Sequence, residues 1–171
     1  MHINLPHIDQ KSYYQFITFR TKDSTDTYIK KLLDINNLTT KSKQYKIDSY
    51  LDNSSSGAYL NGDIVELSKN YLLTLNKDLC EIIAFTIMPN HIHILLLQHD
   101  DLSKIVQQIK GALSFLINKK LNRTGTLWQK DYFDKAIRDQ KHFDLTYLYI
   151  KNNALKTKLQ DAEHRFYGIY R

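Results

Sequence analysis

FTIMPNHIHILLL, residues 85–97, joins two apolar runs through a short polar break. The runs are Cys80–Met88 and Ile92–Leu97, and Pro89 and Asn90 separate them. Proline and asparagine favour turns because of their restricted or locally hydrogen-bonded backbone. The sequence therefore predicts two adjacent strands, joined by a tight turn or bulge, at the centre of a sheet.

Outside this pair, the spacing of apolar residues predicts alternating strands and helices. The expected elements are a strand at Tyr13–Arg20, a short helix at about Tyr28–Leu38, a helix at Asn61–Leu75, a helix from Asp101 to about Lys120, an extended segment at Leu127–Ile137 and a helix at Gln140–Asn152. The stretch Tyr45–Gly57 ends in DNSSSG, which predicts a flexible loop. This alternation favours a compact α+β fold of the ferredoxin-like kind.

Length and composition fit one domain, residues 1–171, of an intracellular protein. With 42% hydrophobic residues, a chain of 171 residues can bury one good core. No stretch has the apolar length that crosses a bilayer, and the N-terminal MHINLPHIDQ lacks the features of a secretory signal. We therefore expect a soluble, cytoplasmic protein in which Cys80, the single cysteine, packs as a small hydrophobe.

The net charge of +6 is unevenly distributed. Residues 102–171 carry 14 Lys+Arg and 6 Asp+Glu, whereas residues 1–101 carry 10 and 12. The basic half also contains Trp128, Tyr132, Phe133, Tyr147 and Tyr149. Cations neutralise phosphates and flat rings stack on unpaired bases, so this half suits a nucleic acid. A solvated charged face is the alternative interpretation.

His91 and His93 are the first candidate site residues. Residues at i and i+2 on a strand point to the same face, whereas Ile92 and Ile94 point to the other face and hold the strand in the core. Two imidazoles on one face are placed to bind one metal ion, although they do not identify it. A pair of surface or hydrogen-bonded histidines is the alternative.

Tyr149 and Asn153 form a second candidate cluster at the end of the last predicted helix. A spacing of four residues places both side chains on one helix face. The amide oxygen of Asn153 is then a plausible third ligand beside the two histidines, next to a tyrosine hydroxyl. Alternatively, Tyr149 is an aromatic packing residue and Asn153 is a helix C-cap.

These segments together resemble a known family. FTIMPNHIHILL is similar to the histidine-hydrophobe-histidine (HUH) motif of the single-strand tyrosine transposases of bacterial insertion sequences, particularly their REP-associated relatives. LWQKDYFDKAIRD, residues 127–139, resembles their tryptophan-centred segment, YIKNNALKTKL, residues 149–159, resembles their tyrosine-helix motif, and SYLDNSSSGAYL, residues 49–60, also resembles a family segment. The likeness covers roughly residues 13–160 in a fixed order.

The resemblance implies a ferredoxin-like (RRM-like) domain with helices packed on one face of an antiparallel sheet. The histidines would lie on a central strand, and the tyrosine on a helix that lies across the sheet near the C-terminus. It further implies that His91, His93 and Asn153 bind Mg²⁺ or Mn²⁺ and that Tyr149 is the nucleophile. Many REP-associated members have Asn-Pro where this chain has Asn153-Ala154, so the helix is expected to continue past Asn153.

The implied activity is DNA transposition. A metal-dependent endonuclease and strand transferase would act on single-stranded, hairpin-containing DNA through a 5′-phosphotyrosine intermediate, as a monomer or a homodimer. Candidate DNA-binding residues in the basic half are Lys104, Lys110, Lys119, Lys120, Arg123, Trp128, Tyr132 and Lys156. Trp128 is equally consistent with a core anchor, and Lys156 with a solvated lysine.

Two other functions remain open from the sequence. The first is a non-catalytic module that binds single-stranded nucleic acid on its sheet. The second is a small metalloenzyme that activates water, in which the histidines are essential and Tyr149 is not. Only the transposase forms a covalent protein–DNA adduct.

Overall fold

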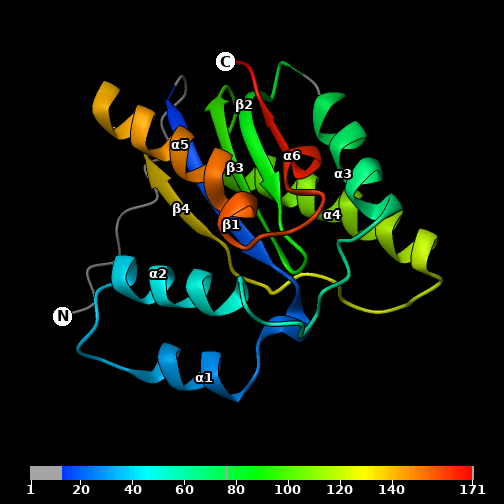
Figure 1. The fold of residues 1–171 in the computed structure, drawn as a ribbon. Helices are drawn as coiled ribbons and strands as arrows, with labels where there is room; N and C mark the ends of the chain where they lie inside the picture. Colours follow the sequence, from blue (N-terminus) through cyan, green and yellow to red (C-terminus); the bar gives the residue numbers. More distant parts are fainter. Residues whose placement is uncertain (1–12, 76, 171) are drawn as a thin grey trace.

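The computed structural model describes residues 13–75 and 77–170, which contain a five-stranded antiparallel sheet (Figure 1). The strands are β1 (Tyr14–Arg20), β2 (Cys80–Ile87), β3 (His91–Gln98), β4 (Phe133–Ala136) and β5 (Phe166–Gly168). Their order across the sheet is β4-β1-β3-β2-β5. The two apolar runs thus form adjacent strands, and β3 is the central strand, as predicted.

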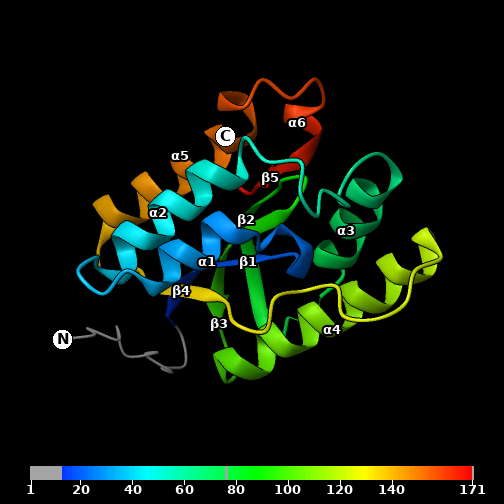
Figure 2. The same cartoon turned by 90° about the horizontal axis from the view of Figure 1, so that it is seen from below.

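The helices lie in layers on both faces of the sheet. They are the 3₁₀ helix η1 (Lys22–Ser24) and the α-helices α1 (Thr27–Asp34), α2 (Thr40–Leu51), α3 (Asp63–Leu73), α4 (Leu102–Leu121), α5 (Gln140–Lys156) and α6 (Ala162–Arg165). Helices α3 and α4 cover one face, and α5 lies across the other (Figures 1 and 2). With strands β1 to β4 this is the β-α-β-β-α-β arrangement of ferredoxin-like folds. The predicted α+β fold with an antiparallel sheet is confirmed, but the helices cover both faces of the sheet and not one, because α5 packs on the face opposite α3 and α4.

The alternation of side chains along the central strands produces two cores. Ile17 and Phe19 of β1 and Ile92 and Ile94 of β3 pack against α3 and α4. On the opposite face, Phe16 and Leu95 pack beneath α5 with Ile150. Because β1 and β3 pair antiparallel with Thr18 opposite His93, both residues of this pair face the α5 side. Thr18 and His93 therefore lie between the sheet and α5.

The segment between β1 and α3 differs from the expectation. Tyr45–Gly57 was predicted to be a flexible loop, but residues 45–51 belong to α2, and only the part from Asp52 onward is loop or turn. Thr39 caps this helix by accepting a hydrogen bond from the Ser42 amide. Ile47 and Leu51 of α2 pack with residues of α1 in a small separate core. The prediction of a loop from DNSSSG was correct for the end of the stretch, but it missed the helix that comes before it.

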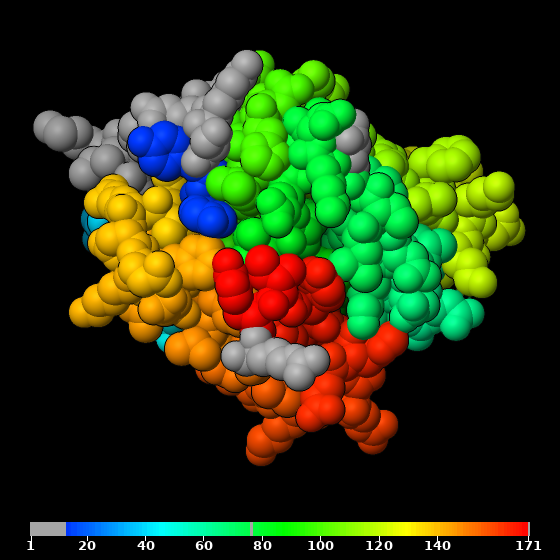
Figure 3. Space-filling model, turned by 90° about the horizontal axis from the view of Figure 1, so that it is seen from above, coloured from blue at the N-terminus to red at the C-terminus, as the bar shows by residue number. Residues whose placement is uncertain are grey.

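The C-terminal segment adds an element that the sequence did not predict. Residues 166–168 form β5 at the edge of the sheet beside β2, so the C-terminal end lies between α5 and the β2–α3 region (Figure 3). Arg165 is buried, and its guanidinium donates to the carbonyl oxygens of Leu60 and Ile87. These hydrogen bonds fasten the C-terminal segment to the body of the fold.

No helix in the described part of the chain is long and apolar enough to cross a membrane. The N-terminal MHINLPHIDQ, on which the expectation about a secretory signal was based, lies outside the described residues. Cys80 is buried in the core beneath α3 and α4, as its apolar surroundings predicted.

Candidate metal and nucleophile site

His91 and His93 project from β3 toward the same face of the sheet, as their spacing predicted. Both rings are fully buried. The Nδ1 atom of His91 lies 2.7 Å from Asn90 Oδ1, and the Nδ1 atom of His93 lies 2.6 Å from Thr18 Oγ1. Each ring therefore uses one nitrogen to fix its orientation, and its Nε2 remains available to a ligand.

Asn90 determines which nitrogen of His91 carries the proton. Its amide nitrogen donates to the backbone carbonyl oxygens of Leu51, Ser54 and Ser56, so its Oδ1 must be the atom that faces His91. An amide oxygen only accepts hydrogen bonds, so the neutral His91 ring carries its proton on Nδ1. The lone pair of His91 is consequently on Nε2.

The surroundings keep both imidazoles neutral. Burial lowers the pKa of His91 to about 3, and the nearby Arg20 guanidinium contributes in the same direction. Burial, followed by the neighbouring His91, also holds the pKa of His93 well below its usual value. Neutral imidazole is the form that binds a metal, so both rings are in the ligand form at neutral pH.

Tyr149 of α5 lies over this histidine pair. Its ring centroid is 5.3 Å from that of His93 and 6.0 Å from that of Phe16. Its hydroxyl donates a 3.0 Å hydrogen bond to Asp48 Oδ2. Burial, and then the charge of Asp48, raise the pKa of the phenol well above 10. The hydroxyl is therefore firmly protonated in the metal-free protein.

Asn153 lies one helical turn after Tyr149 and is buried. A hydrogen bond from its side chain acts to lower the pKa of Tyr149, so the amide lies next to the phenol hydroxyl. The alternative that Asn153 caps the helix is wrong, because α5 continues to Lys156 and Thr157 is the C-cap. The helix continues past Asn153, as the absence of a proline at position 154 predicted.

Asp48 is a site residue that the sequence analysis missed. It lies on α2, is almost fully buried, and also accepts a 2.7 Å hydrogen bond from Gln44 Nε2. Burial raises the pKa of its carboxyl group to about 7, against the effect of the hydrogen bond from Tyr149. One carboxylate oxygen and one nitrogen each of His91 and His93 lie within 4.8 Å of one another. This is the spacing of a metal-ligand set.

Three atoms around this centre that could serve as metal ligands have no hydrogen-bond partner among the described residues. They are Nε2 of His91, Nε2 of His93 and Oδ1 of Asn153, and all three are buried. Buried polar atoms without partners are costly, and each usually has a structural reason. Two imidazole nitrogens with amide and carboxylate oxygens suit a divalent cation. The residues present therefore fit a metal ion.

A second carboxylate borders the same centre. Asp52 Oδ1 lies 3.6 Å from His91 Nε2 and, like the three donor atoms, has no hydrogen-bond partner among the described residues. Burial raises the pKa of Asp52 to about 6, with Lys156 acting in the opposite direction. Lys156 Nζ lies 5.7 Å from the centroid of the Tyr149 ring, so this lysine is on the site side of α5. One carboxylate and one lysine thus lie beside the centre.

Most of the predicted DNA-binding residues lie away from this centre, on α4 and the segment that follows it. They are Lys104, Lys110, Lys119, Lys120, Arg123, Trp128 and Tyr132. Lys110 Nζ donates to the carbonyl oxygens of Gln129 and Lys130. Trp128 is buried, donates from Nε1 to the Lys110 carbonyl oxygen and packs edge-on against Phe19. The core-anchor interpretation therefore describes Trp128, and a stacking role does not.

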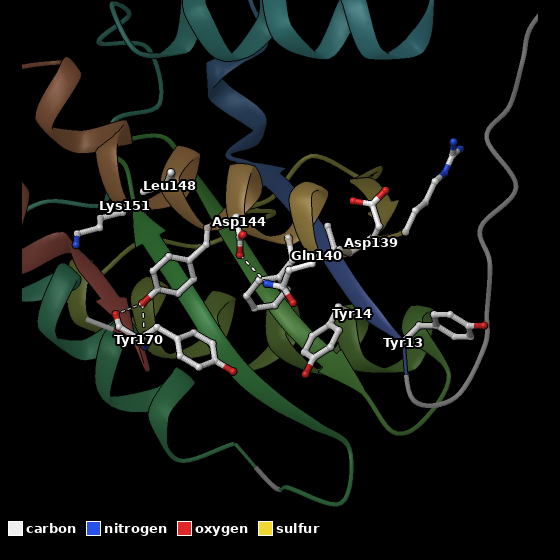
Figure 4. A pocket seen from close by; sticks show the side chains of 12 residues that line it. Tyr13, Tyr14, Asp139, Gln140, Asp144, Leu148, Lys151 and Tyr170 are labelled. Carbon is white, nitrogen blue, oxygen red and sulfur yellow. Dashed lines mark hydrogen bonds between the residues drawn. The ribbon is translucent and has the colours of Figure 1, made fainter.

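An open cavity lies apart from the candidate site. Its volume is about 880 Å³, and its walls are largely aromatic, with Tyr14, Phe143, Tyr147 and Tyr170 among them (Figure 4). Tyr147 Oη and the backbone of Tyr170 are hydrogen-bonded at its edge. The α5 residues that line it lie on the other flank of the helix from Tyr149 and Asn153.

The sequence matches the model of one known protein family. The family model described as "Transposase IS200 like" matches residues 53–153, which is more than half of the chain and includes His91, His93, Tyr149 and Asn153. No curated protein matches the chain.

Two solved structures are similar over most of the chain. A REP-associated tyrosine transposase bound to a REP hairpin shares 18% sequence identity, with 86% of this chain and 70% of that chain covered and a TM-score of 0.47. A transposase candidate from Deinococcus radiodurans R1 shares 15% identity, with 84% of this chain and 92% of that chain covered and a TM-score of 0.49.

Proposed function

Because the chain belongs to the family of IS200-like transposases, we propose that it is a metal-dependent nuclease and strand transferase of single-stranded, hairpin-containing DNA. The observation that carries this proposal is the convergence of Tyr149, Asn153, Asp48 and the two histidines on one face of the sheet. These groups come from α2, β3 and α5, which are far apart in the chain. A merely structural tyrosine does not require unpaired ligand atoms beside it.

The histidine Nε2 atoms and the Asn153 oxygen would hold Mg²⁺ or Mn²⁺, with the Asp48 carboxylate as a further oxygen at the same centre. Thr18 and Asn90 would keep the two imidazoles in position through their Nδ1 atoms. When bound, the cation would neutralise the scissile phosphate and help align it for in-line attack. An open ligand position for a phosphate oxygen is what a catalytic site needs.

Tyr149 would be the nucleophile. Its oxygen would attack phosphorus, and the bond from phosphorus to the 3′ oxygen of the preceding nucleotide would break. The products are a 5′-phosphotyrosyl link and a strand that ends in a 3′-hydroxyl once its oxygen has taken up a proton. Attack on the link by the 3′-hydroxyl of another strand reverses these steps and joins the strands, so no external energy source is needed.

Asp48 is placed to receive the proton of the phenol. Its Oδ2 atom already accepts the Tyr149 hydroxyl hydrogen at 3.0 Å, within the distance for proton transfer. The same carboxylate also raises the pKa of the phenol in the metal-free site. Added positive charge at the centre favours both ionised groups, so the site would become reactive only when it is loaded.

The test is incubation with a labelled single-stranded DNA hairpin and Mn²⁺, followed by denaturing electrophoresis. We expect a covalent protein–DNA adduct from the wild type and none from Tyr149→Phe. Tyr147→Phe is the matched control on the same helix, because its hydroxyl bonds to the Tyr170 backbone and not to the site. Cleavage without an adduct would favour metal-activated water, and binding without cleavage would favour a non-catalytic module.

A further inference from the structure

A second, smaller cavity lies where α2 and α5 begin, and its wall is mostly basic. Its volume is about 440 Å³, and the lining residues are Thr39, Thr40, Lys41, Lys135, Arg138, Asp139 and His142. Lys41 comes from α2, Lys135 from β4, Arg138 from the turn after β4, and His142 from α5. Two segments that are distant in sequence, the start of α2 and residues 135–142, thus bring three cations and one imidazole to a single hollow.

The positive charge of this hollow is not balanced. Among the residues that the structure describes, none of Lys41, Lys135 and Arg138 forms a salt bridge with a carboxylate. Burial, and then the charges of Lys41 and Arg138, lower the pKa of Lys135. The one carboxylate in the lining, Asp139, caps α5 by accepting from the His142 amide. The cations therefore repel one another, and an anion would relieve this repulsion.

His142 is oriented to add a hydrogen-bond donor to the same hollow. Its Nδ1 accepts from the backbone N–H of Arg138 at 3.2 Å. The neutral ring therefore carries its proton on Nε2, which can donate to an anionic oxygen. Burial, and then the charge of Lys135, lower the pKa of His142, so the neutral ring is favoured while the hollow holds no anion.

The hollow lies in line with the proposed reaction centre. His142 and Tyr149 are seven residues apart on α5, and so are Lys41 and Asp48 on α2. Seven residues are two helical turns, which place each pair on one helix face about 10 Å apart. The hydrogen bond between Asp48 and Tyr149 shows that the two helices meet at the reaction centre. Both sites therefore lie along the junction of α2 and α5.

We propose that Lys41, Lys135, Arg138 and His142 bind a backbone phosphate of the DNA strand near the scissile phosphate. This inference rests on the proposed function and specifies which residues bind the backbone of the DNA substrate. Cations and a ring N–H on phosphate oxygens fix the register of a strand without reading its bases. The hollow therefore positions any strand that enters the α2–α5 junction, whatever its sequence.

The test is fluorescence anisotropy with a labelled oligothymidylate in EDTA, at a series of salt concentrations. For single strands, log K falls with log salt by about 0.7 for each phosphate contact. The pair Lys41→Gln and Lys135→Gln removes two of the three cations at this one phosphate and should therefore reduce the steepness of this dependence by up to about 0.7. Affinity should weaken roughly ten-fold, because contacts to charged groups are the stronger hydrogen bonds.

Two controls separate charge from folding. The pair Lys41→Arg and Lys135→Arg keeps the positive charge and should retain the wild-type salt dependence. Lys77→Gln removes an exposed lysine before β2, outside the hollow, and should leave it unchanged. Thermal unfolding of each variant checks that the fold is intact.

The outcomes distinguish this inference from the proposed function. If the glutamine pair binds like Lys77→Gln, or if the arginine pair loses binding as the glutamine pair does, the phosphate site is refuted even where the wild type forms its covalent adduct. If the salt dependence changes as expected but no adduct forms with hairpin DNA and Mn²⁺, the strand site stands and the proposed chemistry fails. Wild-type protein that does not bind the oligothymidylate also overturns the inference.

Discussion

Replacing Asp48 with asparagine should stabilise the metal-free protein at neutral and higher pH. The carboxyl group is buried and its pKa is raised from 3.8 to about 7, chiefly by burial. Asparagine keeps the shape and a hydrogen-bonding oxygen but removes the charge that the fold must bury. We therefore expect Asp48→Asn to change how the free energy of unfolding depends on pH, and to change that free energy less at low pH.

The sign and size of this pH effect follow from the number of protons that the folded and unfolded states bind. Between pH 3.8 and about 7 the folded protein keeps the Asp48 proton and the unfolded chain loses it, so the free energy of unfolding falls as pH rises. The gap between these pKa values corresponds to a loss of about 4 kcal/mol by pH 8. His91 has the opposite effect: because its folded pKa is lowered to about 3, stability rises with pH from there to 6.5.

Since these two trends oppose each other in the wild type, the difference between variant and wild type is the quantity to measure. Urea unfolding in EDTA, followed by circular dichroism from pH 4 to pH 8, should show the advantage of Asp48→Asn growing by about 4 kcal/mol. Asp34→Asn, at an exposed position on α1, is the matched control and should show no such growth. Saturating Mn²⁺ should reverse the order, because the cation favours the ionised carboxylate of the wild type.

A difference that stays constant across this pH range would refute the reasoning, because it would mean that the carboxyl group ionises like an exposed one. A stable Asp48→Asn protein that gains as much stability from Mn²⁺ as the wild type would separate Asp48 from the metal centre.

Two further predictions concern residues that support the site. Asn90→Ala removes the group that fixes the Nδ1 proton of His91, and it should weaken Mn²⁺ binding by calorimetry about 10- to 100-fold, whereas Asn53→Ala, at an exposed amide, should not. Gly57→Ala should lower the free energy of unfolding by about 2 kcal/mol or more, because Gly57 has φ +64° and a Cβ there would meet the Ser24 amide nitrogen at 2.6 Å. Unchanged Mn²⁺ affinity in the first variant, or unchanged urea unfolding in the second, would contradict these expectations.

The geometry of the histidines and of the tyrosine pair was predictable because it depends on local periodicity. A strand repeats every two residues and a helix every 3.6, so His91 with His93, and Tyr149 with Asn153, had to share faces once their elements were assigned. The apolar neighbours Ile92 and Ile94 fixed which face was the core. The chemical roles of these four residues stay predictions, because periodicity determines directions and not reactions.

Asp48 could not be found in this way. Its helix, α2, is mostly polar, and its buried apolar residues, Ile47 and Leu51, pack on α1 rather than on the main sheet. Asp48 also lies before the stretch that matches the family model, which begins at residue 53. Its burial is produced by α5 packing from about a hundred residues away in the chain, so no local pattern marks it.

The positions of the basic residues in the fold could not be predicted from the sequence either. The excess of charge in residues 102–171 was visible in the sequence, but much of it lies on α4, across the sheet from Tyr149. Lys41, in the less basic half, instead reaches the hollow beside Lys135 and Arg138. Charge counted along the chain therefore predicts that a polyanion binds, whereas the folding of α2 against α5 decides which cations lie near the proposed nucleophile.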